Sequence, residues 1–329
     1  MKYPALLTAL LLGLGVAFMA SLLVGPAALS FSTSVAALFG GGNEAAILVM
    51  QEIRLPRALL GAMIGATLGL SGAVLQGFLR NPLADPGILG ISSSAAFGAV
   101  LAIYTGLSAL TSLAVPIAGM GGAVAAVVLL LTLTGRHAGT LTLILAGVAL
   151  SSLSGALTAL ALNLSSNPFA ALEIVFWMLG SLTDRSFVHV AIAAPFMLIG
   201  WLLLFSVGRA LDALTLGAEV AATLGARVRR VRTLAIWGTA VSVGAATSVA
   251  GSIGFVGLIV PHLLRPLVGQ TPSRLLPVSA AGGAILVLIA DVAVRVIAPG
   301  RDIKLGVLTA IVGAPFFVWL VVKTRREEL

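Results

Sequence analysis

The sequence predicts an all-α polytopic membrane protein with about ten transmembrane helices, in one domain covering residues 1–329. Composition is the first observation: 59% of the residues are hydrophobic and 9% are charged, whereas soluble domains average about 45–50% and about 25%. Charge distribution is the second: windows such as 58–79 and 138–172 contain no Asp, Glu, Lys or Arg. Each reaches the roughly 17–25 residues that a spanning helix needs. A β-barrel is excluded, because these runs lack the polar–apolar alternation of barrel strands.

The charge-free windows give the number of spans. Six of them are expected to hold one span each: 3–43, 58–79, 138–172, 186–208, 275–290 and 305–322. The window 86–135 should hold two spans, broken at Tyr104–Ser112. The window 233–264 holds either one long span or two short ones broken near Gly251–Gly254. We expect Met1–Leu23 to be an uncleaved first span, because its apolar run is longer than the core of a typical signal peptide.

The basic residues decide between nine and ten spans, because cytoplasmic loops are enriched in Lys and Arg. With the N-terminus in the cytoplasm, ten spans leave a larger excess of basic residues inside than nine spans do. Ten spans also put both termini and the basic segment 212–232 in the cytoplasm. Spans two to five and seven to ten could form two units of opposite orientation, as in transporters with inverted repeats. Gly61, Gly65 and Gly69 fall on one helix face and predict close packing in the second span.

The chain carries no catalytic or metal-binding signature, so we expect neither enzyme activity nor a bound metal or cofactor. It has no cysteine, and its three histidines match no metal-ligand spacing. No GxxxxGK[ST] loop exists, so the chain cannot hold ATP phosphates in that way. The basic residues lie between apolar runs, which argues for membrane orientation rather than nucleic-acid binding. Asp291 and Arg295 are expected to form an ion pair on one helix face, rather than a proton relay.

The segment Leu214–Arg232 stands out, because it carries four arginines in a sparsely charged chain. Leu216, Val220 and Leu224 recur every four residues and predict an apolar stripe on a helix, with Gly225 as its C-terminal stop. Such a surface suits docking of a soluble subunit that supplies energy. The alternative is an interfacial helix held to anionic lipid by its basic residues.

Seven motifs in order resemble the FecCD-type permeases, the membrane subunits of ATP-binding-cassette (ABC) importers for ferric siderophores, haem and cobalamin. They cover nearly all of the chain after residue 50: RLPRALLGAMIGATLGLSGAVLQGFLRNPLADPGILG at 54–90, LILAGVAL at 143–150, FWMLGSL at 176–182, LTLGAEVAATLG at 214–225, GSIGFVGLIVPHLLR at 251–265, LLPVSAAGGAILVLIADVAVR at 275–295 and LGVLTAIVGAPFFVWLV at 305–321. The resemblance implies a type II importer permease with ten spans in a bacterial inner membrane.

The resemblance also implies the partners. A second permease copy would complete a homodimeric pathway, two cytoplasmic ATPase subunits would bind ATP and Mg²⁺, and an external binding protein would deliver the cargo. The residues implied to couple to the ATPase are Leu216, Gly217, Glu219, Val220, Leu224 and Gly225. Arg54, Arg57 and Arg295 resemble external, exposed arginines that receive acidic residues of the binding protein; bidentate pairing with carboxylates would suit that role.

Two segments resemble the cytoplasmic gate of the family. The first comprises Asn81, Pro82 and Leu83 in a turn after the second span, and the second comprises Thr140 and Leu141. Among cargoes we expect an iron chelate, either a ferric siderophore or haem, with cobalamin as the alternative. A secondary transporter driven by an ion gradient is the alternative class, and the scarcity of ionisable residues inside the spans argues against it.

Overall fold

The structure is a computed structural model that describes residues 2–135, 139–297 and 303–327, and all regular structure in these ranges is helical. The longer helices are α1 (Tyr3–Leu23), α4 (Leu55–Leu79), α5 (Ile91–Tyr104), α7 (Ala114–Thr134), α8 (Thr140–Asn163), α9 (Pro168–Met178), α10 (Phe187–Ser206), α13 (Val228–Ala250), α14 (Val256–Leu264), α15 (Pro272–Ile297) and α16 (Leu305–Glu327). The short ones are α2 (Phe31–Leu38), α3 (Glu44–Ile47), α6 (Leu107–Leu110), α11 (Gly208–Leu214) and α12 (Ala218–Thr223). A π-helix at Leu48–Arg54 joins α3 to α4, and 3-10 turns occupy Pro86–Leu89 and Arg265–Val268.

Eight helices of the described chain are long and apolar enough to cross a membrane, and three apolar helices are shorter. The window 86–135 is broken where the sequence predicts, since α5 ends at Tyr104 and α7 begins at Ala114. The window 233–264 is also broken, because α13 ends at Ala250 and α14 begins at Val256. The eight long helices, α5 and α14 thus occupy the ten predicted spans, and the polytopic all-α fold is confirmed.

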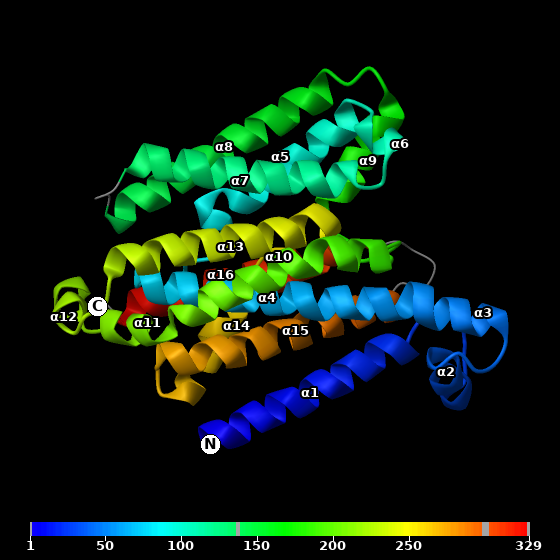
Figure 1. The fold of residues 1–329 in the computed structure, drawn as a ribbon, viewed down its shortest axis with the longest axis horizontal. Coiled ribbons are helices and arrows are strands. Elements are labelled where there is room, and N and C mark those ends of the chain that lie inside the picture. Colours follow the sequence, from blue (N-terminus) through cyan, green and yellow to red (C-terminus); the bar gives the residue numbers. More distant parts are fainter. Residues whose placement is uncertain (1, 136–138, 298–302, 328–329) are drawn as a thin grey trace.

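Helix α4 forms the middle of the bundle and packs against α15, α13, α14 and α10 (Figure 1). Glycine permits the closest of these approaches. A Cβ atom on Gly65 would lie 2.2 Å from the Gly283 carbonyl oxygen, and one on Gly69 would lie 2.1 Å from that of Ser279. Gly61 faces the side chains of Leu182 and Leu288. The predicted glycine face therefore packs closely against α15, as small residues allow helices to do in lipid.

The helix contacts follow the inverted repeat that the sequence suggests. If α4, α5, α7 and α8 correspond in order to α13, α14, α15 and α16, each contact in one set should recur in the other. Helix α5 packs against α7 and α8, and α14 packs against α15 and α16. Helix α4 packs against α14 and α15, and α13 packs against α5 and α7. This agreement supports two four-helix units that run in opposite directions.

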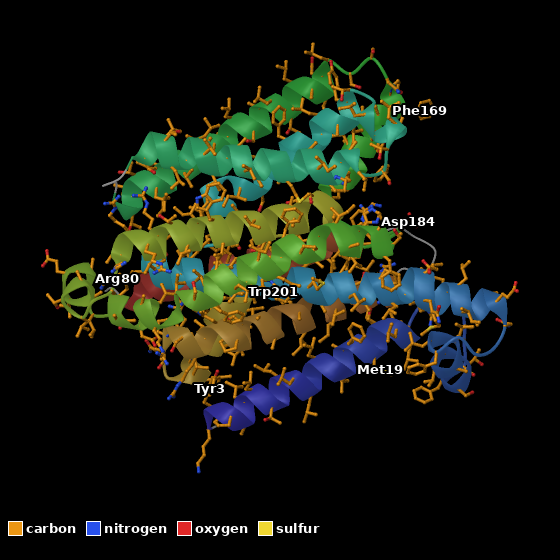
Figure 2. All side chains as sticks on the ribbon, viewed as in Figure 1. Tyr3, Met19, Arg80, Phe169, Asp184 and Trp201 are labelled. Atoms are coloured by element: carbon orange, nitrogen blue, oxygen red, sulfur yellow. The ribbon has the colours of Figure 1, made fainter. Side chains whose placement is uncertain are left out.

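The two ends of the bundle differ. Both termini and α12 lie at one end, and α2, α3, α6 and α9 lie at the other (Figure 1). Side chains mark the same division, with Tyr3 and Arg80 at the first end and Asp184 and Phe169 at the second (Figure 2). Trp201 lies between them, where its Nε1 donates to Thr67 Oγ1 over 2.8 Å and joins α10 to α4. We refer below to the first as the terminal end and to the second as the distal end.

Candidate functional site

The predicted coupling segment forms a small helical protrusion at the terminal end of the bundle. Helix α12 is flanked by Gly217 and Gly225, whose φ angles of 107° and 86° suit glycine. Gly225 N donates to Ala222 O and Ala226 N donates to Ala221 O, which is the hydrogen-bond pattern of a Schellman stop. The predicted C-terminal stop at Gly225 is therefore confirmed, and the helix itself is shorter than the segment.

The apolar stripe of this segment is exposed. Leu216, Val220 and Leu224 expose 62%, 45% and 64% of their surface. Ala221 is fully buried and attaches the opposite face of α12 to the bundle. Glu219 lies in the first turn of α12, where a carboxylate stabilises the helix dipole. Of the three stripe residues, only Val220 lies within α12, since Leu216 precedes the helix and Leu224 is its C-cap residue. Together they form an exposed apolar surface around an anchored helix, which a partner subunit can cover.

Two hydrogen bonds connect the neighbourhood of α12 to the spanning helices. The Asp212 carboxylate of α11 accepts from the backbone N–H of Ser273 at the start of α15, over 2.8 Å. At the start of α13, Arg232 Nη2 donates to Thr134 Oγ1 at the end of α7, over 2.6 Å. A displacement of the coupling segment would therefore act on α15 and α7, the two helices that correspond in the repeat.

At the distal end, a buried carboxylate joins two of the predicted docking arginines. Asp291 of α15 is 1% exposed, and its Oδ1 accepts from Arg57 Nη2 of α4 over 2.7 Å. Its Oδ2 accepts from Arg295 Nη2 over 2.8 Å, which confirms the predicted pair four residues apart. Arg295 also donates to the Ser21 carbonyl and hydroxyl oxygens near the end of α1.

Arg54 completes this cluster from the π-helix that precedes α4. Its guanidinium donates to the carbonyl oxygens of Leu22, Leu23 and Ala27. The last carbonyls of a helix lack partners within the helix and carry partial negative charge. Arg54 and Arg295 thus satisfy the C-terminal end of α1 and hold it against α4 and α15.

The expectation that these arginines are exposed is wrong. Arg54 is 3% exposed, and the side chains of Arg295 and Arg57 are 6% and 15% exposed. The physical reason is the end of α1, whose unpaired carbonyls draw Arg54 and Arg295 inward. The structure does bring the three residues together, as the docking hypothesis requires. Only Arg57 keeps a notable part of its side chain accessible.

A pocket of about 460 Å³ lies at the same end, between α9, the start of α10 and the start of α16. Its charged lining comprises Glu173, Asp184, Arg185 and Lys304. Burial lowers the pKa of the Arg185 guanidinium, and the adjacent Asp184 carboxylate opposes this shift. The pocket therefore offers charges of both signs at the distal mouth of the bundle.

The first predicted gate segment is a compact turn. Asn81 Oδ1 accepts from the backbone N–H of Leu83 over 2.9 Å, which is an Asx turn, and Arg80 before it has φ 50°. Leu83 packs with Leu258 and Leu320, so the turn contacts α14 and α16. The geometry fits a tight Asn-Pro turn that is attached to helices of the second unit.

The second predicted gate segment lies at the start of α8, where Thr140 and Leu141 are exposed. Within the described ranges, no hydrogen bond or core cluster joins these two residues to Asn81, Pro82 or Leu83. Further along α8, Gly147 lies against the Pro86–Leu89 turn, and a Cβ atom there would be 2.1 Å from Ile88 O. The two segments are thus connected through α8 and this turn, and their role in gating remains a prediction.

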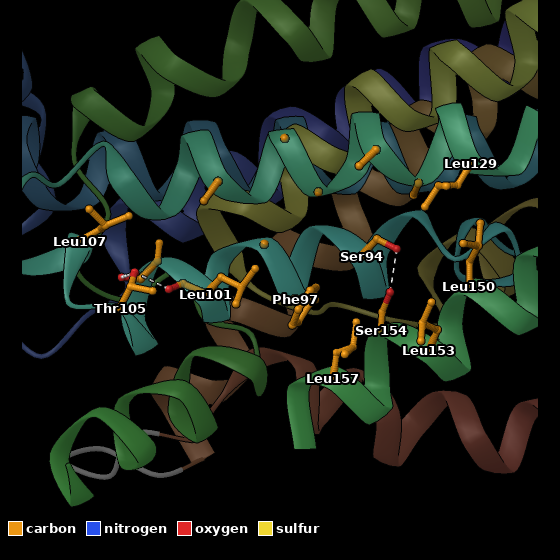
Figure 3. A pocket seen from close by; sticks show the side chains of 17 residues that line it. Ser94, Phe97, Leu101, Thr105, Leu107, Leu129, Leu150, Leu153, Ser154 and Leu157 are labelled. Atoms are coloured by element: carbon orange, nitrogen blue, oxygen red, sulfur yellow. Dashed lines mark hydrogen bonds between the residues drawn. The ribbon is translucent and has the colours of Figure 1, made fainter. Parts of the chain in front are cut away.

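Two pockets beside α5 and α8 differ in chemistry. The first, of about 470 Å³, is lined by leucines and small residues of α5, α7 and α8 (Figure 3). Its Ser94 and Ser154 hydroxyls bond to each other over 2.8 Å, so little polar capacity is left there. The second, of about 240 Å³, contains Asp85, Ser92, Ser93 and Thr158. Asp85 is a site residue that the sequence does not identify, since it follows the predicted gate turn and carries no motif of its own.

The comparisons with known proteins add the family to this geometry. The family model described as the FecCD transport family matches residues 12–323. The chain belongs to this family. The chain is 41% identical over 282 residues to the cobalamin import system permease protein BtuC of Halobacterium salinarum, covering 85% of this chain and 75% of that protein. It is 40% identical over 277 residues to the Fe(3+) dicitrate transport system permease protein FecD of Escherichia coli, covering 84% and 86%.

A solved structure agrees with the same assignment. The FecCD permease superposes on an inward-facing metal-chelate-type ABC transporter with a TM-score of 0.86 and 34% identity, covering 98% of this chain and all of the other. Permeases of this family work with a separate ATPase subunit. The chain is therefore a multi-pass permease subunit of an ABC importer, and the resemblance noted in the sequence is confirmed.

Proposed function

We propose that this permease moves a ferric chelate, a siderophore complex or haem, across the cytoplasmic membrane, as a homodimer powered by two ATPase subunits. The observation that carries the proposal is the position of α12, an exposed apolar protrusion at the terminal end. Its neighbours α11 and α13 are hydrogen-bonded to two spanning helices, α15 and α7. Closure of an ATPase dimer against α12 would act on α15 and α7 through Asp212 and Arg232. We assign the terminal end to the cytoplasm, because it carries the arginines of 227–232.

At the distal end, the binding protein would deliver the cargo above the arginine cluster. The partly accessible Arg57 offers a guanidinium that can form a bidentate pair with a carboxylate of the partner. Such pairs steer association and fix the docked orientation. The gate residues Asn81, Pro82, Leu83, Thr140 and Leu141 would close the opposite end of the pathway.

Cobalamin is the second candidate cargo, and a specific observation favours it. The relative from Halobacterium salinarum is a cobalamin import permease, and its identity to this chain is as high as that of the ferric dicitrate permease. Both cargoes are bulky metal complexes, so one fold can carry either, and function has to be argued from the site.

Reconstitution tests the proposal. The tagged permease would be purified with its ATPase subunit from the membranes of its own host and placed in liposomes with the matching binding protein. We expect uptake of a radiolabelled ferric chelate that requires ATP. Uptake of radiolabelled cobalamin instead would decide for the second candidate. Uptake by the permease alone, driven by an ion gradient, would overturn the ABC mechanism in favour of a secondary transporter.

A further inference from the structure

Two segments without α-helix meet inside the bundle, at residues 81–90, which include the 3-10 turn Pro86–Leu89, and at residues 251–255. Helix α5 has 14 residues and α14 has nine, which at about 1.5 Å per residue is shorter than the roughly 30 Å of a bilayer core. The parts of the preceding segments that adjoin these helices must therefore lie within the thickness of the membrane. Non-helical backbone is tolerated at that depth only where it is buried in protein or lines a cavity.

Both segments line the same cavity of about 240 Å³. Asp85, Pro86 and Gly87 line it from one side, and Ser252 and Gly254 line it from the other. The two segments correspond in the inverted repeat, since one joins α4 to α5 and the other joins α13 to α14. In transporters built from inverted repeats, interrupted helices in corresponding positions surround the cargo site.

Asp85 is the single ionisable group among the described residues that line this cavity. Its Oδ1 accepts from the backbone N–H of Gly87 over 2.9 Å, and no described basic side chain pairs with it. The hydroxyls of Ser92, Ser93 and Thr158 share the cavity and make no hydrogen bond to the described residues. Asp85, Ser92 and Ser93 are each partly accessible, so their polar atoms are available to a group that enters the cavity.

We propose that this cavity is a contact site for cargo in transit, where Asp85 and the adjacent hydroxyls receive a cationic or hydrogen-bond-donating group. Such groups include an ammonium, an amide N–H or a hydroxyl on the chelate. The inference rests on the proposed function, because that function supplies the cargo and its direction of transport. The position and lining of the site come from the cavity alone. A purely structural role for Asp85 would be to cap the Pro86–Leu89 turn, and asparagine can make the same cap. Asp85→Asn therefore separates the two roles.

Charge-selective labelling tests the site without any cargo. Because the chain has no cysteine, Ser93→Cys provides one thiol in the cavity of the full ATPase-bound permease. We expect a cationic methanethiosulfonate to react faster than an anionic one of similar size, on the order of tenfold. Adding Asp85→Asn to Ser93→Cys should remove the preference for the cationic reagent. Ser30→Cys, at an exposed distal position, is the control, and adding Asp85→Asn to it should not change the ratio of the two rates. The proposal would be overturned if the cationic and the anionic reagent reacted with Ser93→Cys at equal rates at both neutral and alkaline pH. It would also be overturned if neither reagent reacted.

Uptake distinguishes this inference from the proposed function. We expect Asp85→Asn to lower the initial rate of ATP-driven cargo uptake several-fold, with unchanged thermal stability and ATPase assembly. Glu44→Gln, which removes an exposed carboxylate at the distal end, should leave uptake unchanged. Wild-type permease without ATP-dependent uptake would contradict the proposed function. Wild-type uptake that Asp85→Asn leaves intact would contradict the contact site alone.

Discussion

The guanidinium of Arg57 and the carboxylate of Asp291 form a bidentate ion pair between residues 234 positions apart. Arg57 Nη2 donates to Asp291 Oδ1 over 2.7 Å, and Arg57 Nε donates to Asp291 Oδ2 over 3.1 Å. The pair joins α4 to α15, and Arg295 links the same carboxylate to the end of α1. Three helices are thus fixed at the distal end by one buried acid.

This relationship predicts that Asp291→Asn destabilises the permease. The substitution leaves two arginines without their counter-charge, and breaking a buried ion pair typically costs about 3–5 kcal/mol. We expect a clearly lower Tm for the detergent-solubilised protein. Asp184→Asn, an exposed acid at the same end, serves as the matched control and should leave the Tm unchanged. A Tm of Asp291→Asn equal to that of the wild type would show that the pair contributes no net stability.

The close packing of α4 against α15 predicts that alanine has opposite effects at two glycines. In Gly69→Ala the new Cβ would lie 2.1 Å from Ser279 O, so α4 and α15 must separate. Overpacking of this kind typically costs about 1–3 kcal/mol. Gly15→Ala in α1 is the control, because nothing lies within 4 Å of its Cβ position and alanine favours a helix by about 0.5–1 kcal/mol. In thermal unfolding, the Tm of Gly15→Ala should equal or exceed that of the wild type, and the Tm of Gly69→Ala should be lower. The reverse order would contradict the close packing of α4 against α15.

The spanning helices and the breaks between them could be predicted from the sequence, because both depend on local properties. The short helices at the distal end, such as α2 and α9, were not predicted. Charge-free runs mark the spans, and Gly251–Gly254 marks the interruption between α13 and α14. The Asp291–Arg295 pair was predictable as well, since residues four apart share a helix face. The glycine spacing of α4 predicted a packed face, although not the helix that packs against it.

The environment of the charged residues could not be predicted, because it depends on distant parts of the chain. Arg54 is buried by the end of α1, and Arg57 pairs with an acid from the other unit of the repeat. The position of Asp85 in a cavity could not be predicted, because nothing in the charge-free window 86–135 marks the start of α5 at Ile91. In each case, tertiary packing decides whether a charge in an apolar segment is exposed, paired or available.

The exposed stripe of the coupling segment predicts a defect in assembly without a defect in folding. Leu224→Arg places a charge on a side chain that is 64% exposed, so the Tm of the permease should not change. The ATPase subunit would have to bury that charge, which is costly without a partner, and co-purification should fall several-fold. Leu110→Arg, at an 80% exposed position on distal α6, is the matched control. Normal ATPase co-purification with Leu224→Arg would exclude the stripe from the docking surface.

The unequal exposure of the arginine cluster predicts unequal effects on the binding protein. Arg57→Gln removes the guanidinium that is 15% exposed, and a partly exposed ion pair contributes about 0.2–1 kcal/mol. We expect the affinity for the binding protein to fall up to about fivefold, and the remaining affinity to depend less on salt. Both variants should lower the Tm, because Arg57 also pairs with the buried Asp291. Arg54→Gln should leave the affinity of the folded fraction unchanged, because its guanidinium is occupied by the carbonyls of α1. Affinity measured by surface plasmon resonance at several salt concentrations checks both variants. An affinity loss in Arg54→Gln as large as that in Arg57→Gln would show that docking opens the cluster and engages its buried members.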